Sequence, residues 1–202
     1  MKKNRYKKVS LQNETILLIV ENSEVAFFNQ YFKQFLEENH QIKIICKSSG
    51  SGNKCEITNF DKMSKIINES IEIYKFKAVF LMIDLDSQCF SRQNNHNCLL
   101  EFLKDYTPKY KIKKELKDKF YLFVVCNEIE SWFLTIDSDK KHTNNPHENH
   151  KKELMKLLKV STEPQIIEKM IINLNRKKFK LDFDKNQSLT HFIKKLNQYY
   201  TN

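Results

Sequence analysis

Four short apolar runs constrain the fold of this chain more than any other feature of its sequence. Two of them, residues 15–20 and 120–125, are apolar at nearly every position, which is typical of strands buried on both faces of a parallel sheet. Parallel strands need crossover connections, and stretches with helical periodicity lie between the runs. The sequence therefore predicts an α/β fold with a mostly parallel, four-stranded sheet flanked by helices. The predicted strands are residues 15–20, 42–46, 78–83 and 120–125.

Helical periodicity is clearest in residues 25–38, where aromatic and apolar side chains form one wide face. Residues 137–149 show no periodicity, and the remainder predicts only short helices, the last of them with Ser188 as its N-cap. We expect residues 1–136 to form the α/β core, and residues 137–202 to form a loop and a short helical C-terminal extension packed on it as one domain. The other predicted helices are residues 66–74, 94–104, 151–158, 164–173 and 188–199.

The chain carries 35 lysine and arginine residues against 25 aspartate and glutamate residues, a net charge of +10. Such an excess favours a polyanionic partner, because basic side chains placed on phosphates release condensed counterions. A general bias of the sequence towards lysine and asparagine is the alternative explanation. Five cysteines at no zinc-like spacing indicate reduced thiols, and no apolar run is long enough for a membrane span or signal peptide. We therefore expect a cytoplasmic protein with no membrane partner.

Pairs of carboxylates follow three of the four predicted strands. The carboxyl ends of parallel strands meet at one edge of a sheet, where ligands bind in open α/β folds. Carboxylates gathered there repel one another unless a cation offsets their charge, and their hard oxygen atoms suit Mg²⁺ or Mn²⁺. The alternative is that each acid merely lies in the first turn of a helix, where the dipole favours negative charge. The pairs are Glu21 with Glu24, Asp84 with Asp86, and Glu128 with Glu130.

Five short motifs occur in order along nearly the whole chain. They are Ile19-Val-Glu21-x-x-Glu24, Gly50-Ser-Gly52, Ile83-Asp-x-Asp86, Glu128-Ile-Glu130-Ser-Trp132 and Ser188-Leu-Thr-His-Phe192. As an ordered set they resemble the Toprim domain of topoisomerases, primases and OLD-type nucleases. Within that superfamily they are most similar to the small RloB-like and OLD-type Toprim proteins of prokaryotic defence loci. The family usually has glycine after the first glutamate, where this chain has Asn22.

The resemblance implies metal-assisted phosphodiester chemistry, with carboxylates moving the proton. Glu21, Glu24 and Glu130 are then the expected catalytic acids. Asp84 and Asp86, together with Glu21, are the expected ligands of Mg²⁺ or Mn²⁺. Trp132 is expected to pack in the core beneath Glu130.

Basic residues are expected to follow a nucleic-acid backbone. The glycine loop is the strongest candidate, because two lysines flank its glycines, and the lysine-rich run 109–114 is a second one, in which Tyr110 would stack on a base. Lysine runs are more often solvated surface, so a solvated surface remains the alternative interpretation of residues 109–114. The expected nucleic-acid-binding residues are Lys47, Gly50, Gly52, Lys54, Lys111 and Lys113.

These observations lead us to expect a metal-dependent nuclease acting on DNA or RNA, in an anti-phage or restriction-linked system. Two alternatives remain: a non-catalytic nucleic-acid or nucleotide-binding module, and a toxin-like effector that needs a partner protein encoded nearby. The substrate, the trigger and the oligomeric state are left open. The loop containing His142, His147 and His150 lacks regular zinc-ligand spacing, so we interpret it as a flexible polar loop.

Overall fold

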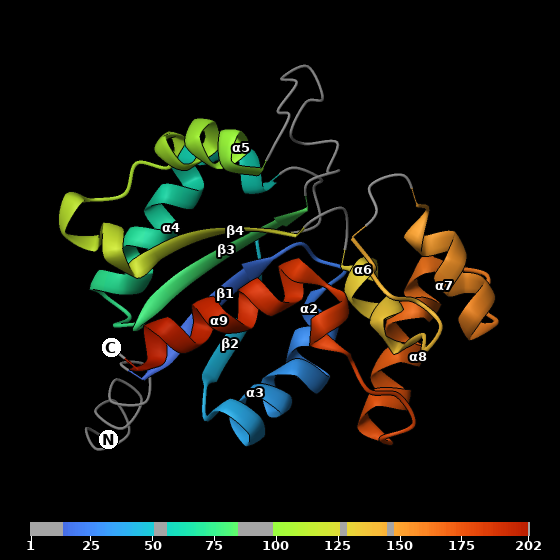
Figure 1. Cartoon of the computed structure of the whole chain (residues 1–202). Helices are drawn as coiled ribbons and strands as arrows, with labels where there is room; N and C mark the ends of the chain where they lie inside the picture. The colour runs from blue at the N-terminus through green and yellow to red at the C-terminus, as the bar shows by residue number, and fades with distance from the viewer. Residues whose placement is uncertain (1–13, 51–55, 85–98, 126–128, 145–147, 202) are drawn as a thin grey trace.

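A four-stranded, all-parallel sheet with the order β2-β1-β3-β4 forms the centre of the molecule, and helices cover both of its faces (Figure 1). The computed structural model describes residues 14–50, 56–84, 99–125, 129–144 and 148–201. The predicted α/β class and parallel four-stranded sheet are therefore confirmed. The strands are β1 (Thr15–Val20), β2 (Lys43–Ser48), β3 (Ala78–Asp84) and β4 (Phe120–Val125).

Burial on both faces explains why the strands are so uniformly apolar. Along β1, Ile16 and Leu18 contribute to the core on one side of the sheet, and Leu17 and Ile19 contribute to the core on the other. All four are at most 2% exposed. Each such side chain contributes roughly 1.5–3 kcal/mol to folding, so a polar residue at any of these positions would be costly.

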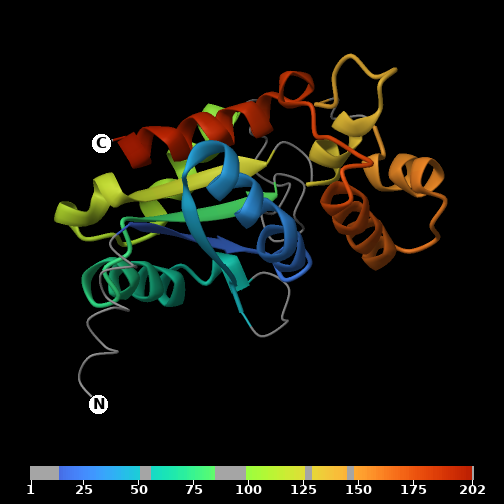
Figure 2. The same cartoon turned by 90° about the horizontal axis from the view of Figure 1, so that it is seen from below.

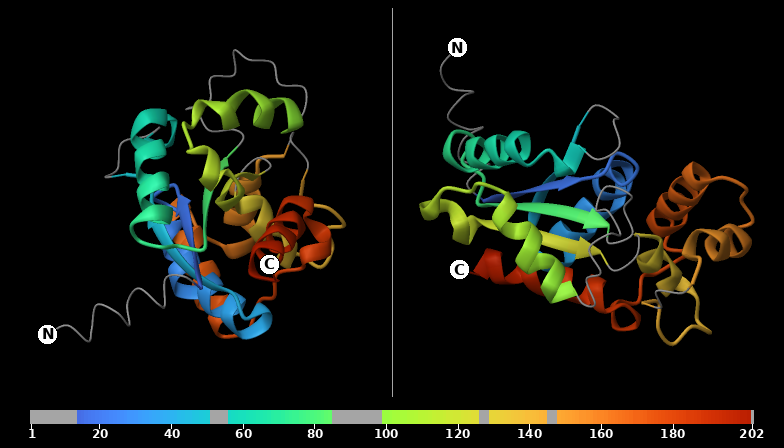
Figure 3. Two further views of the ribbon diagram at one scale, coloured as in Figure 1. Left: turned by 90° about the vertical axis from the view of Figure 1, so that its left-hand side faces the viewer. Right: turned by 90° about the horizontal axis from the view of Figure 1, so that it is seen from above.

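Two groups of helices enclose the sheet. Helices α4 and α5 lie over one face, whereas α2, α3 and α9 lie over the other (Figures 1 and 2). Helices α6, α7 and α8 lie beyond the carboxyl ends of the strands (Figure 3). The helices are α2 (Val25–Phe27), α3 (Lys33–His40), α4 (Phe60–Glu72), α5 (Leu99–Tyr106), α6 (Glu130–Phe133), α7 (His150–Leu158), α8 (Glu163–Asn175) and α9 (Gln187–Thr201).

The single helix predicted for residues 25–38 is interrupted. A π-helical turn, Phe28–Phe32, separates α2 from α3. A π turn takes more residues per turn than an α-helix, so it changes which side chains reach the buried face. Here Phe27, Phe28 and Phe32 are all fully buried, and the rings of Phe28 and Phe32 lie 5.5 Å apart. The aromatic face is thus wider than one α-helical stripe.

The C-terminal helices share the core of the sheet. Leu154 of α7, Ile166 of α8 and Phe192 of α9 are fully buried and belong to the same apolar cluster as Ile16 and Phe80. Among the helices that the structure describes, none combines the length and apolar character needed to cross a bilayer.

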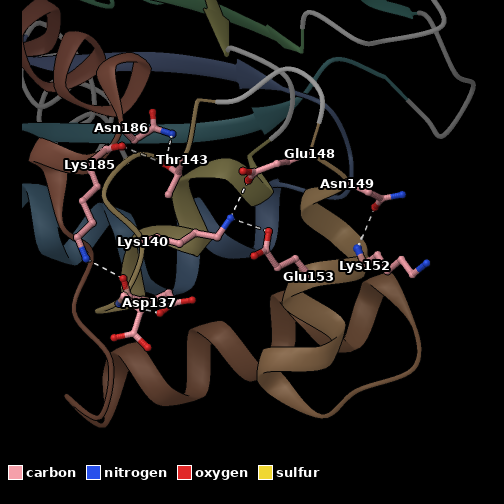
Figure 4. Close-up of polar contacts among 10 residues, drawn as sticks. Asp137, Lys140, Thr143, Glu148, Asn149, Lys152, Glu153, Lys185 and Asn186 are labelled. Carbon is pink, nitrogen blue, oxygen red and sulfur yellow. Dashed lines mark hydrogen bonds and ion pairs between the residues drawn. The ribbon is translucent and has the colours of Figure 1, made fainter.

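The described part of the segment before α7 makes polar contacts with neighbouring segments. Lys140 Nζ lies 2.7 Å from carboxylate oxygens of both Glu148 and Glu153 (Figure 4). The Thr143 N–H also donates to the Lys185 carbonyl at 3.0 Å. These contacts connect a loop that has no helical or strand pattern to the helices around it, and sequence periodicity carries no signal of such contacts.

Among the residues that the structure describes, four helices or turns end at a non-glycine residue with positive φ, namely Gln41, Lys75, Lys159 and Lys177. Glycine normally occupies such left-handed C-terminal positions, because a Cβ there costs roughly 1–2 kcal/mol. This chain has only two glycines, so these four turns place a residue with a Cβ in the less stable left-handed conformation. Lys159, after α7, has φ 54° and ψ 53° and an exposed side chain.

We expect Lys159→Gly to stabilise the protein by about 1 kcal/mol, raising Tm by roughly 2–4 °C, because it removes the left-handed strain. Thermal unfolding followed by circular dichroism measures this. Lys156→Gly, in the last turn of α7, is the matched control and should lower stability, because glycine is less favourable than lysine within a helix. Equal destabilisation by both substitutions would show that residue 159 carries no such strain.

Candidate active site

The edge of the sheet formed by the carboxyl ends of β1 and β3 is a topological switch point. From β1 the chain crosses to β2 on one side, and later returns to place β3 on the other side of β1. Ligands of open α/β sheets bind at such points. Ile19 pairs with Leu81, so Glu21, two residues further along, reaches the level of Ile83, and Asp84 is the next residue of β3.

Three predicted catalytic acids converge at this edge on one cavity of about 400 Å³. Glu21 directly follows β1, and Glu24 lies one turn later, where its N–H donates to the Glu21 carbonyl at 3.2 Å. Glu130 is the first residue of α6, which follows β4. Strand ends far apart in sequence therefore bring these carboxylates together, as the strand-end pattern predicts.

Among the three acids of the cavity, Glu24 has the least favourable electrostatic environment. Its side chain is 2% exposed, and its Oε1 has no hydrogen-bond partner among the described residues. Burial raises the pKa of Glu24 well above its ordinary value, and the charges of Glu21 and Glu130 raise it further, against a weaker opposing backbone hydrogen bond from Glu21. A proton or a bound cation would relieve this excess of negative charge.

The Cys46 thiol of β2 also lies within the influence of Glu24. Burial raises the pKa of Cys46, and the nearby Glu24 carboxylate adds to that effect. Cys46 is 5% exposed, so it is an inert core thiol, as its position at the end of an apolar run predicts.

A buried hydrogen-bond chain fixes the helix that carries Glu130. The indole N–H of Trp132 donates to Ser188 Oγ at 2.8 Å, and that hydroxyl donates to Asn186 Oδ1 at 2.8 Å. The same Asn186 oxygen accepts the Leu189 N–H at 3.0 Å. The predicted N-cap of α9 is therefore wrong by two residues: Asn186 caps the helix, because the buried indole needs Ser188 as its partner. Trp132 is fully buried, as predicted.

The start of the glycine loop is fastened to the end of β1. The Ser49 N–H donates to the Val20 carbonyl at 2.8 Å, and the Ser48 hydroxyl contacts the side-chain oxygen of Asn22. Asn22, in the position where the Toprim family usually has glycine, thus ties the two strand ends together. Lys47 is exposed at this edge.

Only part of the cation site expected at the end of β3 lies within the residues that the structure describes. Asp84 is the last residue of β3, whereas Asp86 lies outside the described residues, as do Gly52, Lys54 and Glu128. Within the described ranges, no three acidic, cysteine or histidine side chains form a metal-binding group by themselves. The described acids of the cavity, Glu21, Glu24 and Glu130, offer only oxygen atoms, the ligand type that hard divalent cations prefer.

The second predicted nucleic-acid surface is poorly suited to phosphate. Lys111 Nζ lies 2.8 Å from Asp61, and Lys113 Nζ lies 2.6 Å from Glu72, so both charges already face carboxylates of α4. The prediction that Tyr110 stacks on a base is wrong, because its ring is 3% exposed and its hydroxyl donates to the Ile57 carbonyl at 3.1 Å.

The outer wall of the acid cavity was not predicted. It comes from the helical extension and includes Lys151 of α7 and Glu163, Pro164 and Glu168 of α8. Lys151 Nζ lies 3.6 Å from Glu163. Sequence periodicity identifies these residues as exposed positions of short helices, but it does not show that α7 and α8 pack against the strand ends.

No family model, curated protein or solved structure matches this chain. The functional argument therefore rests on the chemistry of the cavity.

The raised pKa of Glu24 predicts a pH-dependent cost to stability. The folded state keeps a proton that the unfolded state releases as the pH rises above the ordinary carboxyl range, so the wild type loses stability over that interval. Glu24→Gln removes the titration. We expect its Tm to exceed that of the wild type by about 2–4 °C at pH 8, and the difference to vanish towards pH 4.

Thermal melts from pH 4 to pH 8 in EDTA test this prediction. Glu37→Gln, at an exposed carboxylate of α3, is the control and should follow the wild type at every pH. A gain for Glu24→Gln that is independent of pH would rule out the titration of this group as its cause.

Proposed function

We propose that this protein is a Toprim-like, divalent-metal-dependent nuclease that hydrolyses phosphodiester bonds of DNA or RNA. The observation that carries the proposal is the convergence of Glu21, Glu24 and Glu130 on one cavity at the switch point of a parallel sheet, beside the end of β3. The ordered motifs that resemble the Toprim family support it, and so does the net charge of +10. The same resemblance suggests a role in an anti-phage or restriction-linked system.

The metal ligands in this proposal are Glu21, Asp84 and Asp86. If these residues hold Mg²⁺ or Mn²⁺, the ion would supply Lewis-acid polarisation of a phosphoryl group and would offset the charge that develops there. Its charge also compensates the crowded carboxylates of the cavity.

The remaining groups handle protons and orient the substrate. Glu24 holds a proton more readily than an ordinary carboxyl group, because burial and its acidic neighbours raise its pKa, so it is suited to protonate the leaving oxygen. Glu130, held by the Trp132 hydrogen-bond chain, is suited to accept a proton from the attacking water. Lys151, the basic residue of the cavity wall, is placed to contact a phosphate oxygen.

Cleavage of labelled single-stranded DNA, double-stranded DNA and total tRNA, each with Mg²⁺, Mn²⁺ or EDTA, tests the proposal. We expect strand scission with a divalent metal and none in EDTA. Glu21→Gln and Asp84→Asn each remove a proposed metal ligand and should lower the rate by more than about 100-fold, since losing even an outer-shell partner of a metal costs about 10–100-fold.

Glu37→Gln removes an exposed carboxylate far from the cavity and should cleave like the wild type. Matching melting curves for all variants show that loss of activity is not loss of folding. Substrates that bind but remain uncut in every metal would contradict the proposal and favour the nucleic-acid-binding module.

A further inference from the structure

A second cavity lies at the opposite edge of the sheet, at the amino ends of β3 and β4. Its volume is about 640 Å³, and it is enclosed by the segments that lead into these strands and by the C-terminal half of α9. Figures 1 and 3 place this edge on the far side of the sheet from α7 and α8. The charged and aromatic residues that line it are Lys75, Lys77, Asp118, Lys119, Lys195 and Tyr199.

The charge of this cavity is strongly positive. Four lysines face one carboxylate, Asp118. In the part of the chain that the structure describes, none of the four forms an ion pair with a carboxylate, unlike Lys111 and Lys113. Lysines gathered without acidic partners repel one another, so an anion bound among them would be stabilising.

Neighbouring contacts orient two of these lysines without neutralising them. Lys77 Nζ donates to the Tyr200 carbonyl at 3.0 Å and lies 5.0 Å from the centre of the Tyr200 ring. Lys195 Nζ lies 5.3 Å from the centre of the Tyr121 ring. The positive field also reaches His191, whose pKa is lowered by burial and then by Lys195 and Lys194.

One exposed aromatic side chain, Tyr74, adjoins the lysines. Tyr74 is 54% exposed and Ile73 is 64% exposed, immediately before Lys75 in the chain. Lysine next to an exposed aromatic ring is the combination that binds a polynucleotide, since the charge contacts phosphate and the ring stacks on a base.

We infer that the basic cavity is a second binding site for a polynucleotide substrate. Its lysines would hold phosphates of the strand at a distance from the acids. This inference rests on the proposed nuclease function. The seven residues of β3 separate the two edges by about 20 Å at ~3.3 Å per residue. At ~3.4 Å per base pair, a substrate must exceed about six base pairs to reach both sites.

The test compares two triple variants that remove the same charge. Lys75→Gln/Lys119→Gln/Lys195→Gln changes the cavity, and Lys33→Gln/Lys65→Gln/Lys156→Gln changes exposed lysines scattered over α3, α4 and α7. Fluorescence anisotropy with labelled 30-nucleotide DNA and RNA, single- and double-stranded, is measured in EDTA at several salt concentrations. Because EDTA prevents metal-dependent cleavage, anisotropy measures binding alone. A protein that binds in EDTA but does not cleave in metal would contradict the nuclease proposal and leave this inference standing.

We expect the cavity variant to weaken binding of the 30-nucleotide substrate at least tenfold and to lower the salt slope by up to about 2.7 for a duplex, the value for three lost phosphate contacts. The control triple should stay within about twofold of the wild type. In metal, the cavity variant should slow cleavage of the 30-mer but not of a six-base-pair substrate. A single reversal, Lys195→Glu, repeats the test should the triple variant melt early.

Three results would overturn the inference. Equal weakening by both triple variants would show only a general charge effect. Absence of wild-type binding to every 30-nucleotide substrate would exclude a polynucleotide at this cavity. Competition by a free mononucleotide at micromolar concentration, lost in the cavity variant, would instead identify the cavity as a site for a small phosphorylated molecule.

Discussion

The central position of β1 determines both the stability of the sheet and the geometry of the acid site. Hydrogen bonds to β2 on one side and β3 on the other leave β1 no free edge, and helices bury its two faces. A strand held this firmly has a well-defined carboxyl end, so Glu21, directly after β1, and Glu24, in the turn before α2, follow from a fixed point of the core. The acids can therefore be forced together despite their repulsion, because the apolar packing of β1 outweighs the cost of a buried carboxylate.

Charge is segregated along the strands of this protein. Carboxylates gather at the carboxyl edge and lysines without acidic partners at the amino edge, with an apolar sheet between them. Under the proposed function, a long polyanion that contacts the lysines would gain affinity without approaching the acids, and a cation at the acids would offset their repulsion of its phosphates. Binding and chemistry would then depend on separate groups, so that lysine substitutions change affinity and carboxylate substitutions change rate.

The sequence predicted those features that rest on local apolar patterns. β1 and β4 have the predicted bounds, and β2 and β3 differ by one or two residues, because continuous burial makes a strong signal. The convergence of Glu21, Glu24 and Glu130 was predicted because strand ends in a parallel sheet share an edge. Features that depend on tertiary packing were not: the π turn after α2, the cap of α9, the burial of Tyr110, and the wall that α8 adds to the cavity. The lysine cavity was not predicted either, because its residues come from three separate segments and none of these segments shows a binding motif by itself.

The chain has two glycines, and both follow β2 in the sequence. The chain places lysine or glutamine in left-handed turns where glycine is normally preferred, so glycine is not supplied merely to relieve backbone strain. A Cβ at Gly50 would overlap the Glu56 carboxyl group, which is held by Lys62, so a side chain at that position would have to displace an ion pair. Asn22 fits because its side chain points to Ser48 and adds a contact between β1 and the glycine loop. The Asn22 side chain therefore occupies room beside the acids that glycine would leave open, and it connects the ends of β1 and β2.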